Sequence, residues 1–255
     1  MSLPKPFYEE DGITIYCGDA HKILPLIDKV DMIFTDPPYG HNNNNGDLIH
    51  HWEKVLGKSE KVNESRPIQN DGIEANDLVR WLFKESKRVL AEDGCCCCCC
   101  CGGGGGPDPQ FARWSLWMDE YLSFKQMVIW DKGPMGMGWH YRRSYETVLV
   151  GSKGKKCRWY DSTDKIENII RPGDYGIKKI IPSAKDHPTP KPMELSRHFI
   201  KLHSRPGDVI LDPFCGAGST LEAAKETGRK AIGIDLEDRW LELSIKRLRQ
   251  EILKI

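Results

Sequence analysis

The sequence lacks several features that would assign the protein to a specialised class. It has no apolar run long enough to span a membrane, and its first residues, MSLPKPFYEEDG, lack the basic and apolar regions of a signal peptide. It also lacks net charge, because 37 Lys and Arg residues balance 37 Asp and Glu residues. We therefore expect a cytoplasmic protein with no membrane partner, whose overall charge does not indicate a nucleic-acid partner.

The sequence has no internal repeat, and its length and composition are those of an ordered globular protein. It contains 255 residues, of which 39% are hydrophobic and 29% are charged. That length suits one large α/β domain or two small ones. We expect a single domain over residues 1–255, with variable insertions at residues 41–70 and 152–185.

Basic residues gather in one segment, HYRRSYETVLVGSKGKKCRWY, in which Glu146 is the single acid. A cationic patch of this kind suits contacts with phosphates. A solvated, lysine-rich loop explains the same pattern equally well. The candidate phosphate-binding residues are Arg142, Arg143, Lys155 and Lys156.

Cysteine is abundant, but its arrangement is unusual: seven of the ten cysteines are consecutive, Cys95 to Cys101. Neighbouring cysteines cannot form a disulfide without severe strain, because the bond needs a larger Cα separation than one peptide step. Zinc sites need cysteines spaced along a turn, whereas the side chains of an extended run alternate between two faces. We therefore expect no metal and a wholly buried strand of free cysteines, which requires a reducing compartment.

Short apolar runs predict the strands, and most of these runs are continuous, as in strands that are covered on both faces. Seven candidates occur, at residues 13–17, 31–35, 95–101, 126–130, 145–150, 208–212 and 230–234.

Helical spacing of apolar residues appears between several of these runs. One predicted helix includes Leu78 to Leu90 and closes at Asp93-Gly94, and another begins at Asp108-Pro109. The others are predicted near residues 23–27, 195–202 and 241–252. Alternating strands and helices predict a doubly wound α/β sheet.

A glycine-rich turn near the C-terminal end, in DVILDPFCGAGSTLEAAKETGRKAIGID, has the layout of a nucleotide-binding βαβ unit. One strand ends at Asp212, the turn contains Gly216 and Gly218, and the next strand ends at Asp235. A dinucleotide site would have a third glycine where this chain has Leu221. The Asp-Pro-Phe that begins the turn suits a ligand with a cationic end, such as S-adenosylmethionine, because a carboxylate and an aromatic ring both stabilise a cation.

A second unusual turn, TDPPYG at residues 35–40, follows a predicted buried strand. Taken alone, it could be a proline turn with an exposed tyrosine. Both turns, however, come at the carboxyl ends of strands, where open α/β sheets bind their ligands.

In these two motifs and their order, the sequence resembles the β class of DNA amino-methyltransferases. That class places a DPPY-type motif before the target-recognition region and an FxGxG motif after it, as TDPPYG and LDPFCGAGST are placed here. The stretches YCGDAHKILPLIDKVDMIFTDPPYG and HPTPKPMEL are also similar to the family's. The resemblance implies a permuted, Rossmann-like sheet of seven mostly parallel strands, with residues 152–185 as a candidate target-recognition segment.

The resemblance also implies the chemistry of the DPPY turn. An exocyclic amino group is a poor nucleophile, because its lone pair is delocalised into the base. The Asp36 carboxylate and the Pro37 carbonyl would accept its N–H bonds and stabilise the positive charge that develops on the nitrogen. Pro37 and Pro38 fix that carbonyl, and Tyr39 would stack on a base flipped out of the duplex.

The resemblance further assigns a site for S-adenosylmethionine. Asp235 would bind the ribose, and Asp19 would lie near the adenine, although a helix cap explains Asp19 as well. Thr189 and Lys191 would reach the cofactor's carboxylate, although Lys191 could instead be an ordinary surface lysine. The residues expected to hold the methionine part are Asp212, Phe214, Gly216 and Gly218.

The leading hypothesis is methylation of adenine N6 in double-stranded DNA, because family members acting on adenine usually carry Asp where this chain has Asp36. N4-cytosine methylation is the close alternative. A catalytically silent DNA- or cofactor-binding module would be favoured by loss of Asp36 or Tyr39, and both are present. A dinucleotide oxidoreductase is disfavoured by Leu221. The motif order disfavours a protein-glutamine or RNA methyltransferase, and a homodimer and a cognate restriction endonuclease are left open as partners.

Overall fold

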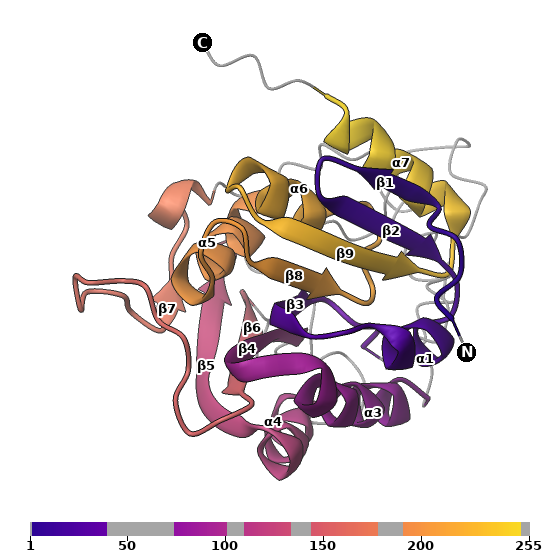
Figure 1. The fold of residues 1–255 in the computed structure, drawn as a ribbon. Helices are drawn as coiled ribbons and strands as arrows, with labels where there is room; N and C mark the ends of the chain where they lie inside the picture. The colour runs from indigo at the N-terminus through magenta and orange to yellow at the C-terminus, as the bar shows by residue number, and fades with distance from the viewer. Residues whose placement is uncertain (1, 40–73, 101–109, 134–143, 178–190, 251–255) are drawn as a thin grey trace, which may run out of the picture.

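The computed structural model describes residues 2–39, 74–100, 110–133, 144–177 and 191–250. Within these ranges the chain forms one nine-stranded sheet with helices on both faces (Figure 1). Its strands, in spatial order, are β1 (Tyr8–Glu10), β2 (Ile13–Cys17), β9 (Lys230–Asp235), β8 (Val209–Asp212), β3 (Val30–Thr35), β4 (Leu90–Cys100), β6 (Tyr145–Ser152), β5 (Ser123–Asp131) and β7 (Ile169–Ile170).

The strand directions confirm the predicted, mostly parallel sheet. Strands β2, β9, β8, β3 and β4 are parallel to one another, whereas β1 runs antiparallel to β2, and β6 runs antiparallel to both β4 and β5. All seven predicted strands are present. The short edge strands β1 and β7 were not predicted, since three and two residues are too few to show a periodic pattern.

The helices lie in two layers that cover the sheet (Figure 1). Helices α1 (Ala20–Ile23), η1 (Leu24–Leu26), α3 (Glu74–Val89) and α4 (Gln110–Tyr121) bury their apolar side chains in one core cluster. Helices α5 (Met193–His203), α6 (Ser219–Glu226) and α7 (Asp238–Leu248) do so in the other, and η2 (Asp174–Gly176) precedes α5.

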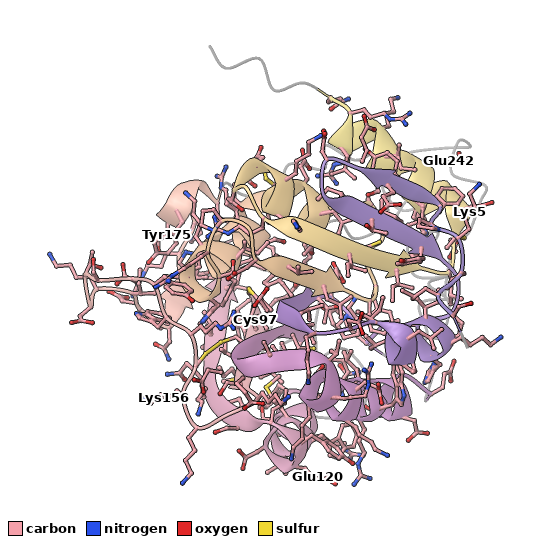
Figure 2. The ribbon with its side chains drawn as sticks, viewed as in Figure 1. Lys5, Cys97, Glu120, Lys156, Tyr175 and Glu242 are labelled. Carbon is pink, nitrogen blue, oxygen red and sulfur yellow. A yellow bond between two sulfur atoms is a disulfide. The ribbon has the colours of Figure 1, made fainter. Side chains whose placement is uncertain are left out.

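The cysteine run forms a buried central strand, as predicted, and Cys101 lies outside the described residues. Side chains of β4 alternate between the two layers: Cys97 and Cys99 pack in the α5–α6 layer, whereas Cys96 and Cys98 pack in the α3–α4 layer. Cys97 accordingly lies in the interior of the molecule (Figure 2). Burial raises the pKa of the Cys96 thiol to about 12, so this thiol stays protonated.

The structure corrects the predicted end of the helix before β4. Helix α3 ends at Val89, and Leu90 already pairs with β3, so the helix does not continue to Asp93-Gly94. Those residues instead form an irregularity in β4, where the register shifts between Val30 and Met32. A Cβ on Gly94 would lie 2.8 Å from the Asp31 carbonyl oxygen, so only glycine fits this close approach. Of the predicted cap at Asp108-Pro109, neither residue is described, and α4 is described from Gln110.

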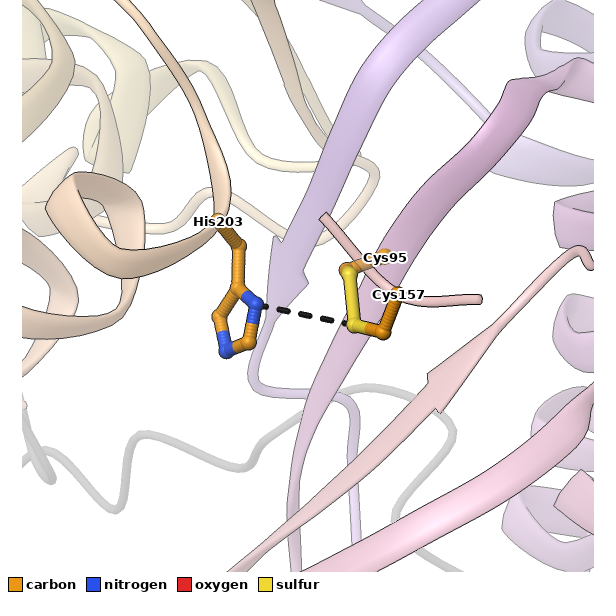
Figure 3. A group of neighbouring side chains, drawn as sticks. All are labelled: Cys95, Cys157 and His203. Atoms are coloured by element: carbon orange, nitrogen blue, oxygen red, sulfur yellow. Dashed lines mark hydrogen bonds between the residues drawn. A yellow bond between two sulfur atoms is a disulfide. The ribbon is translucent and has the colours of Figure 1, made fainter. Parts of the chain in front are cut away.

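The structure also corrects the expectation that all the cysteines are free. Cys95 and Cys157 form a disulfide with a Cα–Cα distance of 6.0 Å (Figure 3). After β6 the chain turns back along the start of β4, where the Arg158 amide donates to the Asp93 carbonyl over 3.1 Å. Sequence reasoning considered pairs within the run, whereas the partner comes from 62 residues further along the chain.

A histidine lies beside this disulfide, and the three side chains together resemble a metal-ligand set. The Nδ1 atom of His203 is 3.6 Å from the Cys157 Sγ (Figure 3). It is also 2.8 Å from the Arg158 carbonyl oxygen. A carbonyl accepts only from a protonated nitrogen, so Nδ1 carries the proton and does not present its lone pair to a metal. The expectation of no bound metal stays a prediction.

None of the helices in the described parts of the chain combines the length and apolarity needed to cross a membrane. Nothing in the structure tests the division of the chain into one domain with two insertions, which stays a prediction. Residues 41–70 lie outside the described residues, whereas residues 152–177 are described and contain only β7 and η2 beyond the end of β6.

Candidate active site

The two motifs meet at one edge of the sheet. Strands β2, β9, β8 and β3 are parallel and therefore end at the same edge, with Asp36 directly after β3, Asp212 at the end of β8 and Asp235 at the end of β9. The antiparallel strand β6 begins at this edge, and its second residue is Glu146. With Asp19 after β2, carboxylates from five strands therefore lie at this edge.

The glycine turn is held by hydrogen bonds to the acid at the end of β9. The Gly216 amide donates to Asp235 Oδ2 over 2.9 Å, and the Glu237 amide donates to Asp235 Oδ1 over 3.0 Å. Gly216 and Gly218 have positive φ values of 46° and 80°, which side chains disfavour. Burial raises the pKa of Asp235, an effect that its backbone donors oppose. Asp235 thus organises the turn, and its role as a ribose ligand stays a prediction.

The helix after the turn packs closely on the sheet although the third glycine of a dinucleotide motif is absent. Leu221 is fully buried on α6, and the strand opposite it supplies the small residue, Gly233. A Cβ on Gly233 would lie 2.8 Å from Leu221 Cδ1 and 2.9 Å from Cys215 Sγ. The close helix–strand contact is therefore kept with the glycine on the strand instead of on the helix.

Asp212 is buried and connects the two motifs. Its Oδ1 accepts a hydrogen bond of 2.8 Å from Thr35, the residue before Asp36, and one of 3.1 Å from the Phe214 amide. Burial raises the pKa of Asp212 to about 7, although these bonds and one from Thr220 favour the ionised form. The group can therefore change protonation state near neutral pH, and a cation bound beside it would favour the carboxylate.

Asp19 has the local role that the sequence also allowed. It is the N-cap of α1, and its Oδ1 accepts a hydrogen bond of 2.9 Å from the His21 amide. It also lies close to the glycine turn, since the Gly18 amide donates to the Asp235 carbonyl over 2.8 Å. Contact with an adenine stays a prediction for Asp19.

The DPPY turn presents an acid and an aromatic ring that contact each other. The Tyr39 hydroxyl donates to Asp36 Oδ1, and the Tyr39 ring lies 6.1 Å from the ring of Trp114, measured between centroids. Pro37 is buried and Pro38 half-buried. The two prolines therefore form a rigid link between Asp36 and Tyr39 at the site edge.

Lys191 belongs to this turn in space and is not an ordinary surface lysine, since its side chain is only 11% exposed. Its Nζ lies 2.8 Å from Asp36 Oδ2 and donates to the Tyr39 hydroxyl over 2.9 Å. Burial opposes the charge, but Asp36 and Glu146 together raise the pKa of Lys191 above its usual value. Its predicted contact with a cofactor carboxylate stays a prediction, and its companion Thr189 lies outside the described residues.

Two further charged residues in this cluster were not among the predicted site residues. Glu146 lies 3.2 Å from Lys191 Nζ through its Oε2 and accepts a hydrogen bond of 2.7 Å from Lys132 through its Oε1. Burial favours the neutral acid, but the two lysines outweigh it and lower the pKa of Glu146. The sequence did show that Glu146 is the single acid in a basic segment. That pattern does not indicate which lysine or arginine pairs with it.

The predicted DNA-contacting residues separate into two groups. Lys155 and Lys156 are exposed and follow the end of β6, whose eight residues separate them by roughly 25 Å from the edge where that strand begins. Lys156 accordingly points away from the body of the molecule (Figure 2). Arg142 and Arg143 lie outside the described residues, directly before Ser144 in the sequence. The structure therefore does not bring the two lysines to the DPPY turn.

Taken together, the fold and the site define a class. The open α/β sheet carries a glycine turn after β8 and an acid–proline–proline–aromatic turn after its direct neighbour β3. Two such turns side by side at the ligand-binding edge fit an enzyme that methylates amino groups with S-adenosylmethionine. The chain belongs to the DNA methylase family of N6- and N4-amino methyltransferases, whose family model matches residues 30–246. It is an S-adenosylmethionine-dependent DNA methyltransferase.

Relatives of known activity match nearly the whole chain. The protein is 28% identical to the type II methyltransferase M2.DpnII of Streptococcus pneumoniae, over 98% of this chain and 94% of that protein. It is 25% identical to the DNA adenine methyltransferase YhdJ of Escherichia coli, over 94% of this chain and 84% of that protein.

Solved structures support the fold. The complex of M1.HpyAVI with S-adenosylmethionine is 27% identical and superposes with a TM-score of 0.65, covering 92% of this chain and all 100% of that one. The cytosine-N4-specific PvuII methyltransferase superposes with a TM-score of 0.71, covering 98% of this chain and 91% of that one, at 19% identity. At that identity the second likeness bears on the fold alone.

Proposed function

We propose that the protein transfers a methyl group from S-adenosylmethionine to the N6 amino group of an adenine flipped out of double-stranded DNA, with Asp36 and Pro37 holding that amino group. One observation carries this proposal: the Thr35 hydroxyl donates to Asp212 over 2.8 Å, which joins the strand before Asp36 to the glycine turn. The turn that would hold the base and the turn that would hold the cofactor are therefore parts of one rigid edge.

The residues of the DPPY turn would prepare the amino nitrogen for attack. The Asp36 carboxylate and the Pro37 carbonyl each accept one N–H bond, which directs the nitrogen lone pair toward the methyl group and stabilises the developing positive charge. Pro37 and Pro38 hold the carbonyl in place. The Tyr39 ring, next to that of Trp114, provides an aromatic face on which the flipped base can stack.

The glycine turn fits the cofactor, which supplies an electrophilic methyl group on a sulfonium ion. Gly216 and Gly218 leave the turn without side chains, so the ligand can approach the backbone. Asp212, buried at the end of β8, would stabilise the cationic end of the ligand, and the aromatic Phe214 follows two residues later in the turn. Asp235 would bind the ribose, and Asp19 would lie near the adenine.

Adenine is the proposed target because this chain carries Asp at position 36 and because relatives such as YhdJ are named as adenine enzymes. The type II names of other relatives also support a cognate restriction endonuclease as partner. A cytoplasmic location and a homodimer complete the proposal, and sedimentation of the purified protein tests the second.

The decisive experiment is sequencing of modified bases in DNA from cells that express the protein. We expect N6-methyladenine at one short recognition sequence, and none in cells that express Asp36→Ala. Removing a group that acts mainly in the transition state should lower methyl transfer by about two or more orders of magnitude, with adenosylmethionine affinity nearly unchanged in calorimetry. N4-methylcytosine in place of methyladenine would overturn the target, and normal methylation by Asp36→Ala would overturn the role of the turn.

A further inference from the structure

Four alternating charges lie at the site edge, and they form one connected cluster. Lys191 lies between Asp36, at 2.8 Å, and Glu146, at 3.2 Å, and Lys132 holds the other oxygen of Glu146 at 2.7 Å. The side chains of Lys191 and Glu146 are only 11% and 15% exposed. Two cations and two carboxylates balance, which is the condition for burying them together.

This cluster conflicts with the proposed use of Asp36. An amino group that binds the Asp36 carboxylate needs one of its oxygens, but Tyr39 donates to Oδ1 and the Lys191 ammonium lies on Oδ2. Each oxygen of Asp36 therefore already has a donor of the protein's own. An ammonium on a carboxylate is a charge-assisted contact, which is stronger than one from a neutral amino group. The base therefore competes with Lys191 for Asp36, although each carboxylate oxygen keeps a second lone pair.

Glu146 offers Lys191 a second partner. The Oε2 atom of Glu146 is buried and has no aligned hydrogen bond in the described structure, although the Lys191 ammonium is only 3.2 Å away. Lys132 fixes the carboxylate through its other oxygen. A small rotation of the lysine side chain would exchange the Asp36 contact for a hydrogen bond to Glu146, so that the ammonium would never lack a partner.

The backbone of Lys191 does not need to move in this exchange. Its carbonyl accepts a hydrogen bond of 2.9 Å from the hydroxyl of Ser219, the first residue of α6. The main chain at Lys191 is thus fixed to the helix that follows the glycine turn.

We propose that Lys191 is a gate on Asp36: its ammonium occupies the Asp36 carboxylate when no base is bound. When the amino group of the target base binds Asp36, the ammonium moves to Glu146, which is the positioning residue. This proposal rests on the proposed function, since it gives the resting state of the same base-binding turn. It explains why a second carboxylate, that of Glu146, lies 3.2 Å from the Lys191 ammonium. It also keeps the half-buried Asp36 carboxylate paired in the empty enzyme.

The test measures base capture without chemistry. The target adenine is replaced by the fluorescent base 2-aminopurine in a duplex that carries the recognition sequence found by base sequencing, and demethylated cofactor is present throughout. We expect Lys191→Met to strengthen capture, because the competitor for Asp36 is gone, and Glu146→Gln to weaken it, because the lysine loses its alternative partner. Each change should be about tenfold, the usual size of a hydrogen bond to a charged group.

A matched control is Lys153→Met, which removes a lysine of similar burial, 17% exposed, that is paired with Glu92 at the opposite edge of the sheet. It should leave capture unchanged. Lys191→Arg should capture as weakly as the wild type, because it keeps the charge. The opposite signs of the Lys191→Met and Glu146→Gln effects distinguish a gate from a merely structural role. If both variants weakened capture, the gate would be wrong, whereas failure of the wild type to methylate DNA would instead overturn the proposed function.

Discussion

At the scale of single residues, the buried Asp212 and the half-buried Glu146 at the same edge show how the surroundings set the charge. Glu146 has two lysines beside it, and they lower its pKa in spite of burial. Asp212 has only neutral donors, and burial raises its pKa to about 7. Glu146 is therefore held ionised, whereas Asp212 lies near its titration point, because only Glu146 has a cation within contact distance.

The raised pKa of Asp212 predicts how cofactor affinity depends on pH. The cationic end of adenosylmethionine favours the carboxylate, so affinity should rise between about pH 6 and pH 8 as the group loses its proton. Asp212→Asn should bind more weakly above pH 7, and the part of the pH dependence that Asp212 causes should disappear. Calorimetric titrations at several pH values measure both effects.

The same group fixes the sign of a stability effect in the protein without cofactor. A carboxyl whose pKa rises on folding stabilises the folded state below its ordinary pKa, near 4, and this contribution is lost as the pH rises to about 7. Urea unfolding should therefore show a decline over that range that Asp212→Asn lacks. An identical pH profile in the variant would mean that Asp212 does not titrate as described.

At the scale of elements, the glycine turn depends on the contact between α6 and α7. A Cβ on Gly218 would lie 2.0 Å from the Oγ and 2.8 Å from the Cβ of Ser244, a fully buried residue of α7. Gly218→Ala should therefore displace α7 from the turn and lower the free energy of unfolding by about 3 kcal/mol, from steric overlap added to the strain of a positive φ. It should also weaken adenosylmethionine binding.

A matched control separates overlap from strain. Gly207 has a similar φ of 90°, but nothing lies within 4 Å of the position of its Cβ. Gly207→Ala should lower stability by only about 1–2 kcal/mol, the cost of the backbone conformation alone. Equal losses in the two variants would show that Ser244 does not limit the turn.

The disulfide is the second feature that belongs to this scale, because it ties the start of β4 to the chain after β6. Closing a loop with a sequence separation of 62 residues should contribute about 4 kcal/mol to stability. Cys157→Ser should lower the free energy of unfolding by that amount, and a reducing agent should lower the wild type to the same value. The exposed free Cys17 provides the control, because Cys17→Ser should change nothing under either condition.

The same variant tests the prediction that no metal is bound. Zinc in a one-to-one ratio in the purified wild type, lost in Cys157→Ser, would contradict it. It would also mean that His203 presents its lone pair to the cysteines instead of donating to Arg158.

At the scale of the whole molecule, the chemistry and the disulfide lie at opposite edges of the sheet. Asp36 and Glu146 lie where β3 ends and β6 begins, whereas Cys95 and Cys157 lie near where β4 begins and β6 ends. DNA that presents a flipped base to Asp36 must approach the first of these edges. Basic residues close in sequence to the start of β6 should therefore contact it more than those that follow its end.

This polarity gives a prediction about DNA binding. Replacing both Arg142 and Arg143 by alanine should weaken DNA binding at every sequence and reduce the slope of log affinity against log salt by about 2, if each contacts one phosphate. Replacing Lys155 and Lys156 in the same way should leave the slope nearly unchanged, because they lie roughly 25 Å away along β6. Filter binding at a series of salt concentrations compares the two double variants, and an equal loss in both would show that DNA extends over the second edge.

The sequence by itself determined the seven longer strands and the two turns, and the resemblance of those turns to a known family indicated the kind of reaction. Those features are local: seven apolar runs, the glycines at 216 and 218, and the DPPY corner each depend on residues within a few positions of one another. Even the buried cysteine strand could be predicted, because its alternation between two faces follows from the geometry of any extended chain.

Only the tertiary structure decided which distant residues meet. Lys191 lies on Asp36 because the segment before α5 returns to the end of β3, and Glu146 joins them because β6 runs antiparallel to β4. In the same way, Cys95 meets a cysteine 62 residues away instead of a neighbour. Pairing, burial and pKa depend on which groups come within a few ångströms in space, and sequence separation does not give that distance.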